Sequence, residues 1–470
     1  AARGAPRPSP GAPLRRAAPA APATVCGPER THPRRERTRE PMYWREVVAS
    51  LYAWDLLDEG LDHMLDVLQK ETLTNSTYLV ALMHDEKRPL TDFYYPHNPR
   101  RKVYWTEDSR AYWRPNPDRY ADSRIKPRLS DNEELQGRDW LQELIDGSRA
   151  RGMGTGAELS HTWVDKERAA TEFADCMQKD IYGQAFDQQM CFNNPDVRAY
   201  GVALYCDLAA GYDIDFVMTC VRGFNPGRGA PAARTPERVP FGSNEIQRLV
   251  GIVRGGCFCE HCQRAAERRG LDWPAMVERL RWLADGYDRF NARQAFDLNL
   301  LFNSVETATA LLAEIPELYA FLKFRTDSIT EFFGQIYKAV HEAKPGIDVR
   351  LNHYAGYPEL MGLDLKGVGQ FMDSVRSSDY SEQSGDPARM EWKRGYLHQV
   401  RHAIGVDKYF LSAISPRPKA TPELVKQGIL ISAQCGADAL TIGHYDGSWM
   451  NCLRAIKTGL EEAGVEIKRD

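Results

Sequence analysis

Three cysteines stand close together in this chain, in the segment GCFCEHC. Cys257, Cys259 and Cys262 follow the spacing C-x-C-x-x-C, which suits thiolates that bind one soft metal ion. A structural zinc site needs four protein ligands, so one must come from elsewhere. His261 would have to reach back beside Cys262, and among the distant cysteines Cys191, in QQMCFNNPDVRAY, is the best candidate. The alternative is that these thiols are small buried hydrophobic side chains.

Two cysteine-containing segments together resemble glycoside hydrolase family 42, the β-galactosidase family. They are CFNNPDVRAY (191–200) and CFCEHCQRAA (257–266), and the likeness covers about residues 185–285. In some members of that family the four matching cysteines bind one zinc ion. The resemblance implies a (β/α)8 barrel that contains a closed structural zinc site. The ligands that it implies are Cys191, Cys257, Cys259 and Cys262.

The catalytic residues of family 42 have no counterpart in this sequence. The family carries an Asn-Glu pair at the tip of strand four, and that Glu is the acid/base. The corresponding text here is DFVMTCVRG, which places Cys220 and Val221 at the pair and Arg222 after it. Strand seven, where the family has its nucleophilic Glu, reads YFLSAISPRP and has no carboxylate. The chain therefore resembles the family in fold, as a divergent relative that lacks the acid/base Glu.

The elements that must position these residues alternate between strands and helices from Met42 onward. Helical patterns such as residues 317–343 and 421–437 separate eight short β-branched or aromatic runs. This order predicts an α/β fold, a (β/α)8 TIM barrel with long βα loops. An open doubly wound sheet fits less well, because no glycine-rich phosphate loop follows the first strand. The predicted strands are Glu46–Trp54, Thr77–His84, Gly152–Thr162, Ile214–Arg222, Ile347–Tyr354, Met372–Tyr380, Tyr409–Ser415 and Ala439–Tyr445.

Carboxylates follow or end several of these strands, and barrel chemistry occurs at the C-terminal ends of strands. Glycoside cleavage needs two carboxyl groups, one protonated and one ionised. They lie about 5–5.5 Å apart in retaining enzymes and about 6.5–9.5 Å apart in inverting ones. Glu158 and Glu382 are the preferred candidates for these two groups. An unpaired carboxylate within an apolar strand, such as Glu158, is costly and therefore suggests a function. The full set of predicted catalytic residues is Glu158, Glu382, Asp379 and Asp446.

Aromatic, amide, imidazole and guanidinium side chains accompany these carboxylates. Aromatic rings stack on the apolar faces of sugars, and Asn, His and Arg bond to hydroxyl groups. Two long predicted loops, after strands two and four, would emerge at the same face of the barrel. The predicted substrate-binding residues are Arg222, Asn352, His353, His444, Trp163 and Tyr445.

These features predict a glycosidase-like hydrolase whose partner is a carbohydrate. A second hypothesis is a barrel that binds carbohydrate without cleaving it, which the missing family pair favours. A third is an isomerase or lyase that acts on sugar acids. It would need a catalytic divalent ion bound by oxygen and nitrogen ligands.

The composition restricts which partners and which cell compartment we expect for the protein. A net charge of -4 provides no global basic field for nucleic acid or for an anionic membrane. No apolar run approaches the roughly 20 residues that span a bilayer. Clustered thiols that must stay reduced favour the cytoplasm. Association of the chain with copies of itself is left open.

The first 41 residues differ in composition from the rest of the chain. They are rich in Ala, Pro and Arg and contain almost no large aliphatic residues, so we expect residues 1–41 to be a disordered N-terminal extension. Arg15 and Arg16 could belong to an export signal, but the following AAPAAPAT is short and proline-rich for an apolar segment. Residues 42–470 are predicted to form the barrel.

Overall fold

The structure is a computed structural model, and it describes most of the chain beyond residue 41. The described residues are 42–83, 95–102, 108–220, 223–224, 244–291, 308–354, 358–417 and 419–468. The predicted extension 1–41, the predicted ligand Arg222 and parts of both long loops lie outside these residues.

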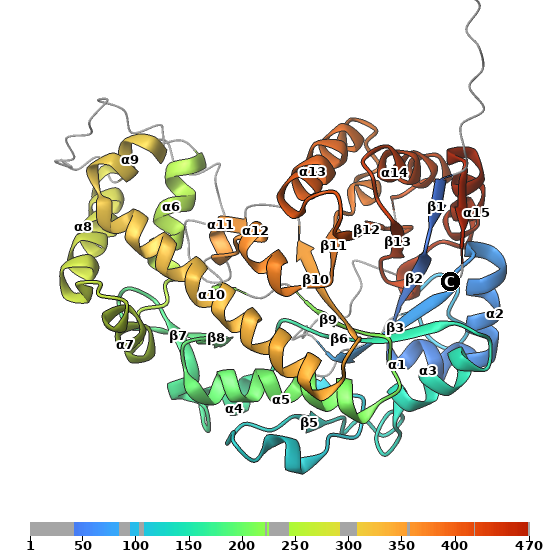
Figure 1. The fold of residues 1–470 in the computed structure, drawn as a ribbon, viewed down its shortest axis with the longest axis horizontal. Helices are drawn as coiled ribbons and strands as arrows, with labels where there is room; N and C mark the ends of the chain where they lie inside the picture. Colours follow the sequence, from blue (N-terminus) through green and yellow to red (C-terminus); the bar gives the residue numbers. More distant parts are fainter. Residues whose placement is uncertain are drawn as a thin grey trace, which may run out of the picture. The chain divides into compact units, whose positions relative to one another are not determined.

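Eight parallel strands close into a barrel, which confirms the predicted architecture (Figure 1). Each predicted strand overlaps one of them. In barrel order the strands are β2 (Glu46–Leu51), β3 (Ser76–Leu82), β6 (Gly154–Leu159), β9 (Phe216–Thr219), β10 (Asp348–Tyr354), β11 (Ser374–Ser378), β12 (Tyr409–Ile414) and β13 (Ala439–Ile442). Because β13 pairs with β2 and β2 with β3, the ring is closed and has no free edge.

The connections between these strands carry the helices. They are α1 (Ala53–Asp55), α2 (Leu61–Thr72), α3 (Trp140–Arg149), α4 (Lys166–Ala170), α5 (Pro195–Gly211), α6 (Asn244–Gly255), α7 (Glu260–Arg268), α8 (Trp273–Asn291), α9 (Ala308–Glu314), α10 (Pro316–Ala343), α11 (Pro358–Met361), α12 (Leu365–Val368), α13 (Ala388–Ile404), α14 (Pro422–Gln434) and α15 (Met450–Ala463). On one side of the barrel α13, α14, α15 and α2 pack each against the next (Figure 1).

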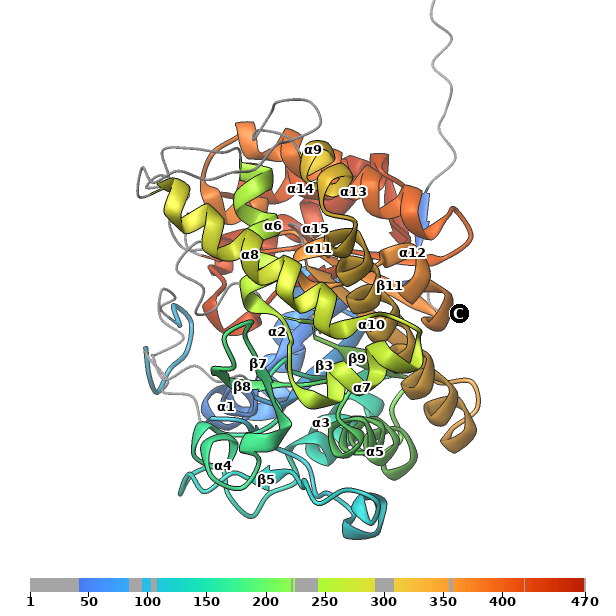
Figure 2. The same ribbon diagram turned by 90° about the vertical axis from the view of Figure 1, so that its left-hand side faces the viewer.

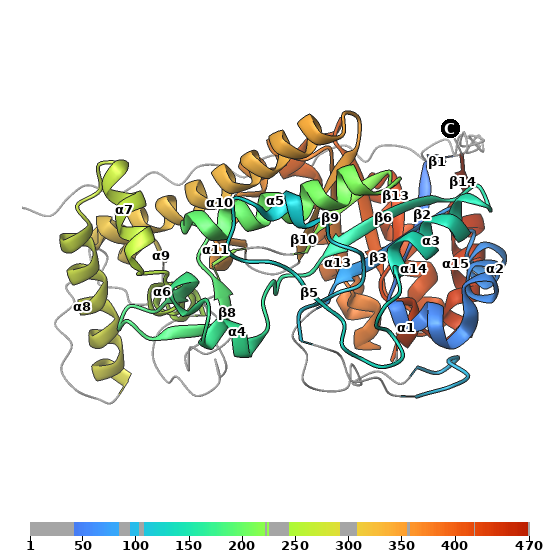
Figure 3. The same cartoon turned by 90° about the horizontal axis from the view of Figure 1, so that it is seen from below.

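Helix α10 shows how the apolar pattern of the sequence sets the packing. Its predicted apolar face is buried, and α10 packs along α5 outside the barrel (Figure 3). Pro316 starts the helix, where a missing backbone N–H costs nothing. The large apolar side chains that α10 buries are Leu318, Phe321, Phe324, Ile329, Phe332, Phe333, Ile336 and Val340.

Two segments extend from the barrel on the side of α10. The first and last described strands pair with each other on another side. A hairpin of β7 (Met177–Lys179) and β8 (Ala185–Met190) follows β6, and helices α6 to α9 follow β9 (Figure 2). Strand β1 (Met42–Trp44) pairs in parallel with β14 (Val465–Ile467), which ties the start of the described chain to its end. The short strands β4 (Arg110–Ala111) and β5 (Arg128–Leu129) extend the sheet from β3. Among the described residues, no helix is both long and apolar enough to cross a membrane.

Candidate active site and metal centre

Glu158 lies near the C-terminal end of β6, and its side chain points into the barrel. It reaches across the interior to β10, two strands away, where Asn352 Nδ2 donates a hydrogen bond to Glu158 Oε1 at 3.3 Å. Only 4% of Glu158 is exposed. Burial raises the pKa of the Glu158 carboxyl, and the positive charge of Arg376 opposes this rise. A raised pKa near the operating pH suits a group that exchanges protons with a substrate or water.

Arg376, on β11, holds Asn352 in the orientation that Glu158 needs. Its Nη1 donates to Asn352 Oδ1 at 2.7 Å and also bonds to the hydroxyl of Ser378, while its Nη2 donates to Tyr380 Oη at 2.9 Å. The amide oxygen of Asn352 is therefore engaged, so its NH2 group faces Glu158. Asn352, which was predicted to bind substrate, links Arg376 to Glu158, and its substrate role stays a prediction.

Asp446 follows β13 at the same end of the barrel, in the 3-10 turn Tyr445–Gly447. It is 1% exposed, and neither carboxylate oxygen has a hydrogen bond of normal geometry with the described residues. The backbone N–H of Gly447 and the guanidinium of Arg417 are still near enough to favour its ionised form. Arg417 Nη2, in the connection that follows β12, lies 3.7 Å from Asp446 Oδ1. Burial raises the pKa of Asp446, and the charge of Arg417 opposes this rise.

Asp55 lies in helix α1, which follows β2, the strand that pairs with β13 before Asp446. The backbone N–H of Tyr52 donates to Asp55 Oδ2 at 2.8 Å, and Asp55 Oδ1 accepts no hydrogen bond from the described residues. Burial raises the pKa of Asp55 well above its usual range, and the charge of Asp446 raises it further. We call Asp55, Asp446 and Arg417 the mouth cluster.

His444 links the end of β13 to the end of β2. Its Nδ1 lies 2.7 Å from the hydroxyl of Tyr52, and the Tyr52 ring stacks between His444 and Trp54 at centroid distances of 5.5 and 4.3 Å. The backbone of His444 has φ 58°, a left-handed conformation that costs a non-glycine residue about 1–3 kcal/mol. Such strain persists where the surroundings fix it, and it occurs often at functional sites.

Tyr445 is fully buried and joins the loop after β3 to this end of the barrel. Its hydroxyl donates to Glu59 Oε2 at 2.9 Å, and its ring lies 4.4 Å from that of His97. His97 Nδ1 in turn lies 2.9 Å from Glu59 Oε1. Burial lowers the pKa of His97, but the carboxylate of Glu59 outweighs it and the net direction is upward. Tyr445 therefore fixes the local structure through Glu59.

Asp379 and Glu382, the other two predicted catalytic carboxylates, are held by a lysine behind the barrel wall. Lys393 Nζ, on α13, lies 3.2 Å from Asp379 Oδ1 and 2.9 Å from Glu382 Oε1. It also donates to the carbonyl of Ala413 at 2.8 Å. All three charged side chains are almost completely buried. We call Asp379, Glu382 and Lys393 the wall cluster.

Two further predicted substrate ligands lie away from the barrel interior. His353 follows the inward-facing Asn352 and stacks on Tyr396 of α13 at 5.9 Å. Burial lowers its pKa to about 4, so the imidazole is neutral. Trp163 packs edge-on against Tyr200 of α5 and Phe332 of α10. Both side chains are buried between the barrel wall and the outer helices, where they contribute to packing.

The sequence analysis missed three residues of this site, namely Asp55, Arg417 and Arg376. Asp55 directly follows the first predicted strand, and Arg417 comes two residues after the seventh. A search of the residues just beyond every predicted strand would have found both. Arg376 lies inside the sixth predicted strand, and a charge within a strand that must be buried is itself a signal.

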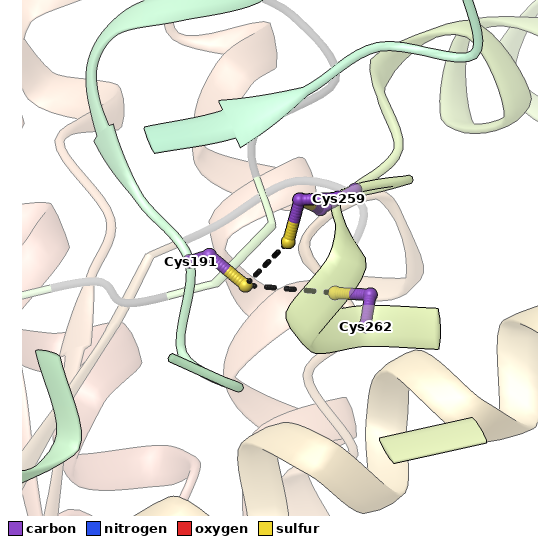
Figure 4. Close-up of side chains that lie close together, drawn as sticks. Cys191, Cys259 and Cys262 are labelled. Atoms are coloured by element: carbon purple, nitrogen blue, oxygen red, sulfur yellow. Dashed lines mark hydrogen bonds between the residues drawn. The ribbon is translucent and has the colours of Figure 1, made fainter. Parts of the chain in front are cut away.

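The four predicted metal ligands come together as one buried group. Their sulfur atoms all lie within 4.8 Å of one another, and Cys191 Sγ is 3.5 Å from Cys262 Sγ and 3.4 Å from Cys259 Sγ (Figure 4). Zn–S bonds of about 2.3 Å in a tetrahedron put the sulfur atoms about 3.8 Å apart, so the group can hold such an ion. The members are Cys191, after β8, Cys257, before α7, and Cys259 and Cys262, at the start of α7.

The surroundings of the cysteines fit a negatively charged metal–thiolate group. The backbone N–H of Lys179 donates to Cys257 Sγ at 3.2 Å, and Asn193 Nδ2 donates to Cys262 Sγ at 3.3 Å. The fully buried Arg325 feels the charges of Cys262 and Cys257, which oppose the loss of its proton on burial. Burial raises the pKa of Cys262, so four thiolates would need a bound cation to stay ionised.

His261 lies outside the group of four cysteines. Its Nε2 is 3.1 Å from Asn194 Nδ2, and its Nδ1 is 2.9 Å from Arg264 Nη2. The prediction that Cys191, and not His261, joins the three clustered cysteines is therefore confirmed, and metal binding stays a prediction. Since four side chains fill a tetrahedral site, a metal bound here would have no open position for a substrate.

Comparison with known proteins gives a result at the level of the fold. No family model and no curated protein matches the sequence. Among solved structures, the PgaB (BpsB) glycoside hydrolase domain from Bordetella bronchiseptica is similar, with a TM-score of 0.53, 12% identity, and coverage of 88% of this chain and 98% of that domain. A GH42 β-galactosidase from G. stearothermophilus has a TM-score of 0.50 and 14% identity over 90% of this chain. The α-L-fucosidase isoenzyme 2 from Paenibacillus thiaminolyticus has a TM-score of 0.50 and 13% identity over 89%.

These neighbours define the class of fold, a (β/α)8 barrel of the kind that glycoside hydrolases use. The chain spans 57% of the β-galactosidase and 49% of the fucosidase. At such low identities the likeness concerns the fold alone, so the resemblance to family 42 stays a prediction beyond the shared barrel.

Proposed function

We propose that the protein is a glycoside hydrolase-like enzyme that cleaves a glycosidic bond with Glu158 and Asp446. Both side chains lie at the C-terminal end of the barrel, Glu158 in β6 and Asp446 in the turn after β13, and both have a raised pKa with an arginine nearby. Two carboxyl groups that exchange protons at this position are what glycoside cleavage requires.

The contrast with the wall cluster carries this choice. Lys393 pairs with both Asp379 and Glu382, at 3.2 and 2.9 Å. Asp446, in contrast, has no cation closer than Arg417 at 3.7 Å within the described part of the chain. A carboxylate in a close buried ion pair is poorly available for proton transfer. Of the four predicted carboxylates, Glu158 and Asp446 therefore fit the chemistry best.

The test is a turnover screen with aryl glycosides of different sugars, followed by single substitutions. We expect Glu158→Gln and Asp446→Asn to lower kcat by about 10²–10⁴-fold, because each removes a group that moves a proton. The control is Glu382→Gln, which removes a buried carboxylate of the wall cluster. Full activity in Glu158→Gln or Asp446→Asn, or a loss confined to Glu382→Gln, would refute the assignment.

A second candidate is a carbohydrate-binding barrel without hydrolase activity. It is favoured by the sequence at the end of β9, where family 42 has its Asn-Glu pair and this chain has Cys220 and Val221. The sulfur of Cys220 lies 3.5 Å from His161 Nδ1. A glycan array separates the two functions. Binding of a glycan by the wild type, with no turnover of the corresponding aryl glycoside, would support the binding function.

We also propose that the four cysteines bind one structural Zn²⁺ and that the protein works in the reducing cytoplasm, with a carbohydrate as its partner. Four thiolates select zinc over hard cations. Metal analysis should find about one zinc per chain, and Cys259→Ser should lose both the zinc and stability. The control is Cys452→Ser, a buried cysteine outside the group of four. A stable wild-type protein that contains no zinc would contradict the proposal.

A further inference from the structure

Several acidic side chains lie where β2 and β13 end, and some of them have a polar or charged partner within 3 Å. Asp58 lies 2.7 Å from Arg101 Nε and accepts a hydrogen bond from Asn98 Nδ2 at 2.8 Å. Glu59 has His97 on one oxygen and Tyr445 on the other, each at 2.9 Å.

Asp55 and Asp446 differ from these neighbours. Three of their four carboxylate oxygens, namely Asp55 Oδ1 and both oxygens of Asp446, are shielded from solvent and have no hydrogen bond of normal geometry with the described residues. Leaving a buried acceptor unsatisfied costs about 1–3 kcal/mol. The two residues follow neighbouring strands of the barrel, and the segments that carry them are joined by the 2.7 Å contact between Tyr52 Oη and His444 Nδ1. A shared proton between the two carboxyl groups, or a bound substrate hydroxyl, would satisfy these oxygens.

The two carboxyl groups have unequal surroundings. After burial, the largest influence on Asp55 is the negative charge of Asp446, and both raise its pKa. After burial, the largest influence on Asp446 is the positive charge of Arg417, which favours the ionised form. Two neighbouring carboxyls in such a setting cannot both ionise easily, so one proton stays with the pair. The other charged groups that face the pair are Asp58, Glu59 and His97.

We propose that Asp55 and Asp446 hold one proton between them and that Asp446 delivers it to the glycosidic oxygen of a bound sugar. Asp446 is then the catalytic residue, and Asp55 is a positioning residue that acts through it. This inference rests on the proposed glycosidase function and adds to it the source of the proton. It assigns Glu158, beside Arg376 and Asn352, to the opposite role of base or nucleophile.

The reaction balances without a further reactant. As the bond from the anomeric carbon to the leaving oxygen breaks, the proton of the pair moves to that oxygen. Water attacks the anomeric carbon, either directly or after Glu158 has bonded to it, and loses one proton. In the first case, direct attack, that proton goes to Glu158. In the second case, attack on the carbon bonded to Glu158, it goes to the Asp55–Asp446 pair. In the first case solvent carries a proton from Glu158 back to the pair.

The shared proton can be measured without a substrate. Infrared spectra of protein with ¹³C-labelled aspartate, recorded over a pH series, show the carbonyl stretch of protonated aspartic acid separately from ionised aspartate. We expect one such signal to persist to neutral pH in the wild type and to vanish in Asp55→Asn, which keeps the acceptor for the Tyr52 N–H. In Asp446→Asn the signal should titrate at lower pH, because the charge that raises the pKa of Asp55 is gone.

The matched control is Asp58→Asn, which removes a carboxyl of the same segment that already has Arg101 as partner. The persistent signal should survive this change. Absence of the signal in the wild type, or its unchanged titration in Asp446→Asn, would overturn the shared proton.

The role of the Asp55–Asp446 pair as proton donor is tested by kcat/KM for two kinds of glycoside. In Asp55→Asn, kcat/KM for alkyl glycosides, which need protonation of the leaving oxygen, should fall about 10²–10⁴-fold. For aryl glycosides with acidic phenol leaving groups it should fall much less, and the limb of the pH profile on the alkaline side should shift. Equal losses for both substrates would refute donation by the pair. If the wild type turns over no glycoside, the proposed function and the donor role fail together, while the infrared result still decides whether the proton is shared.

Discussion

The wall cluster and the mouth cluster are both buried groups of two acidic side chains with one cation, and they differ in how closely the cation is held. In the wall cluster Lys393 contacts Asp379 and Glu382 at 3.2 and 2.9 Å. In the mouth cluster Arg417 stays 3.7 Å from Asp446. The first arrangement gives both acids an ion-pair partner within 3.2 Å, and the second holds its cation farther away.

The difference teaches that burial alone does not identify a reactive carboxylate. Burial raises the pKa of Glu382 as it raises that of Glu158. The position of the partner separates them, since Lys393, between α13 and the barrel wall, contacts Glu382, Asp379 and the carbonyl of Ala413. A close buried ion pair stabilises a fold only while both partners are present.

Loss of the lysine should have the largest effect. Lys393→Met leaves two carboxylates buried without their cation, so we expect the free energy of unfolding to fall by about 3–5 kcal/mol. Urea denaturation measures this change. The control is Arg394→Met on the same helix, where the ion pair with Glu391 is partly exposed and should contribute at most about 1 kcal/mol. Equal effects of the two substitutions would show that Lys393 does not hold the wall cluster.

Removal of one acid from the wall cluster should have a smaller effect. In Glu382→Gln, Lys393 keeps Asp379 as its partner, and the lost charge-assisted hydrogen bond should cost about 1.5–3 kcal/mol. Any glycosidase activity should remain at the wild-type level when measured below the unfolding temperature. Inactivity of a folded Glu382→Gln protein would remove the distinction between the two clusters.

Glu158→Gln should have the smallest effect on stability. It should stabilise the fold, whereas the two substitutions in the wall cluster should destabilise it. Because the pKa of Glu158 is raised in the folded state, its proton stabilises the fold fully below pH 4.5, and this contribution is lost as pH rises through the raised pKa. Gln does not titrate, so the variant should match the wild type at acid pH and exceed it by about 1 kcal/mol at pH 8. Thermal unfolding across that pH range checks this, and a variant less stable than the wild type at pH 8 would contradict it.

The sequence predicted the barrel well, because its strands and helices follow local patterns. Each of the eight predicted runs overlaps a barrel strand, and the apolar face of residues 317–343 is buried in α10. The cysteine spacing likewise predicted the group that Cys191 completes, because short spacing and a matching distant segment are both visible in the sequence. The identity of a bound metal stays a prediction.

The candidate site was harder to predict, because partners decide what a carboxylate does. Glu158 and Glu382 look alike in the sequence, as acids near the ends of strands. The sequence did not show that Asn352 would bond to Glu158 or that Trp163 would pack against α5 and α10. No local pattern shows that Lys393, on a helix, reaches the chain after β11.

The sequence by itself determined the order of strands and helices, the buried faces and the clustered thiols, because these depend on residues that are neighbours or follow a fixed period. Only the tertiary structure decided which charges meet. It brought Asp55 at the start of the barrel beside Asp446 near the end of the chain, because closure of the ring pairs β2 with β13. It also placed Lys393 against Glu382 and left Asp446 without a close cation among the described residues. Contacts across a closed barrel join residues hundreds of positions apart, and such distances carry no local signal.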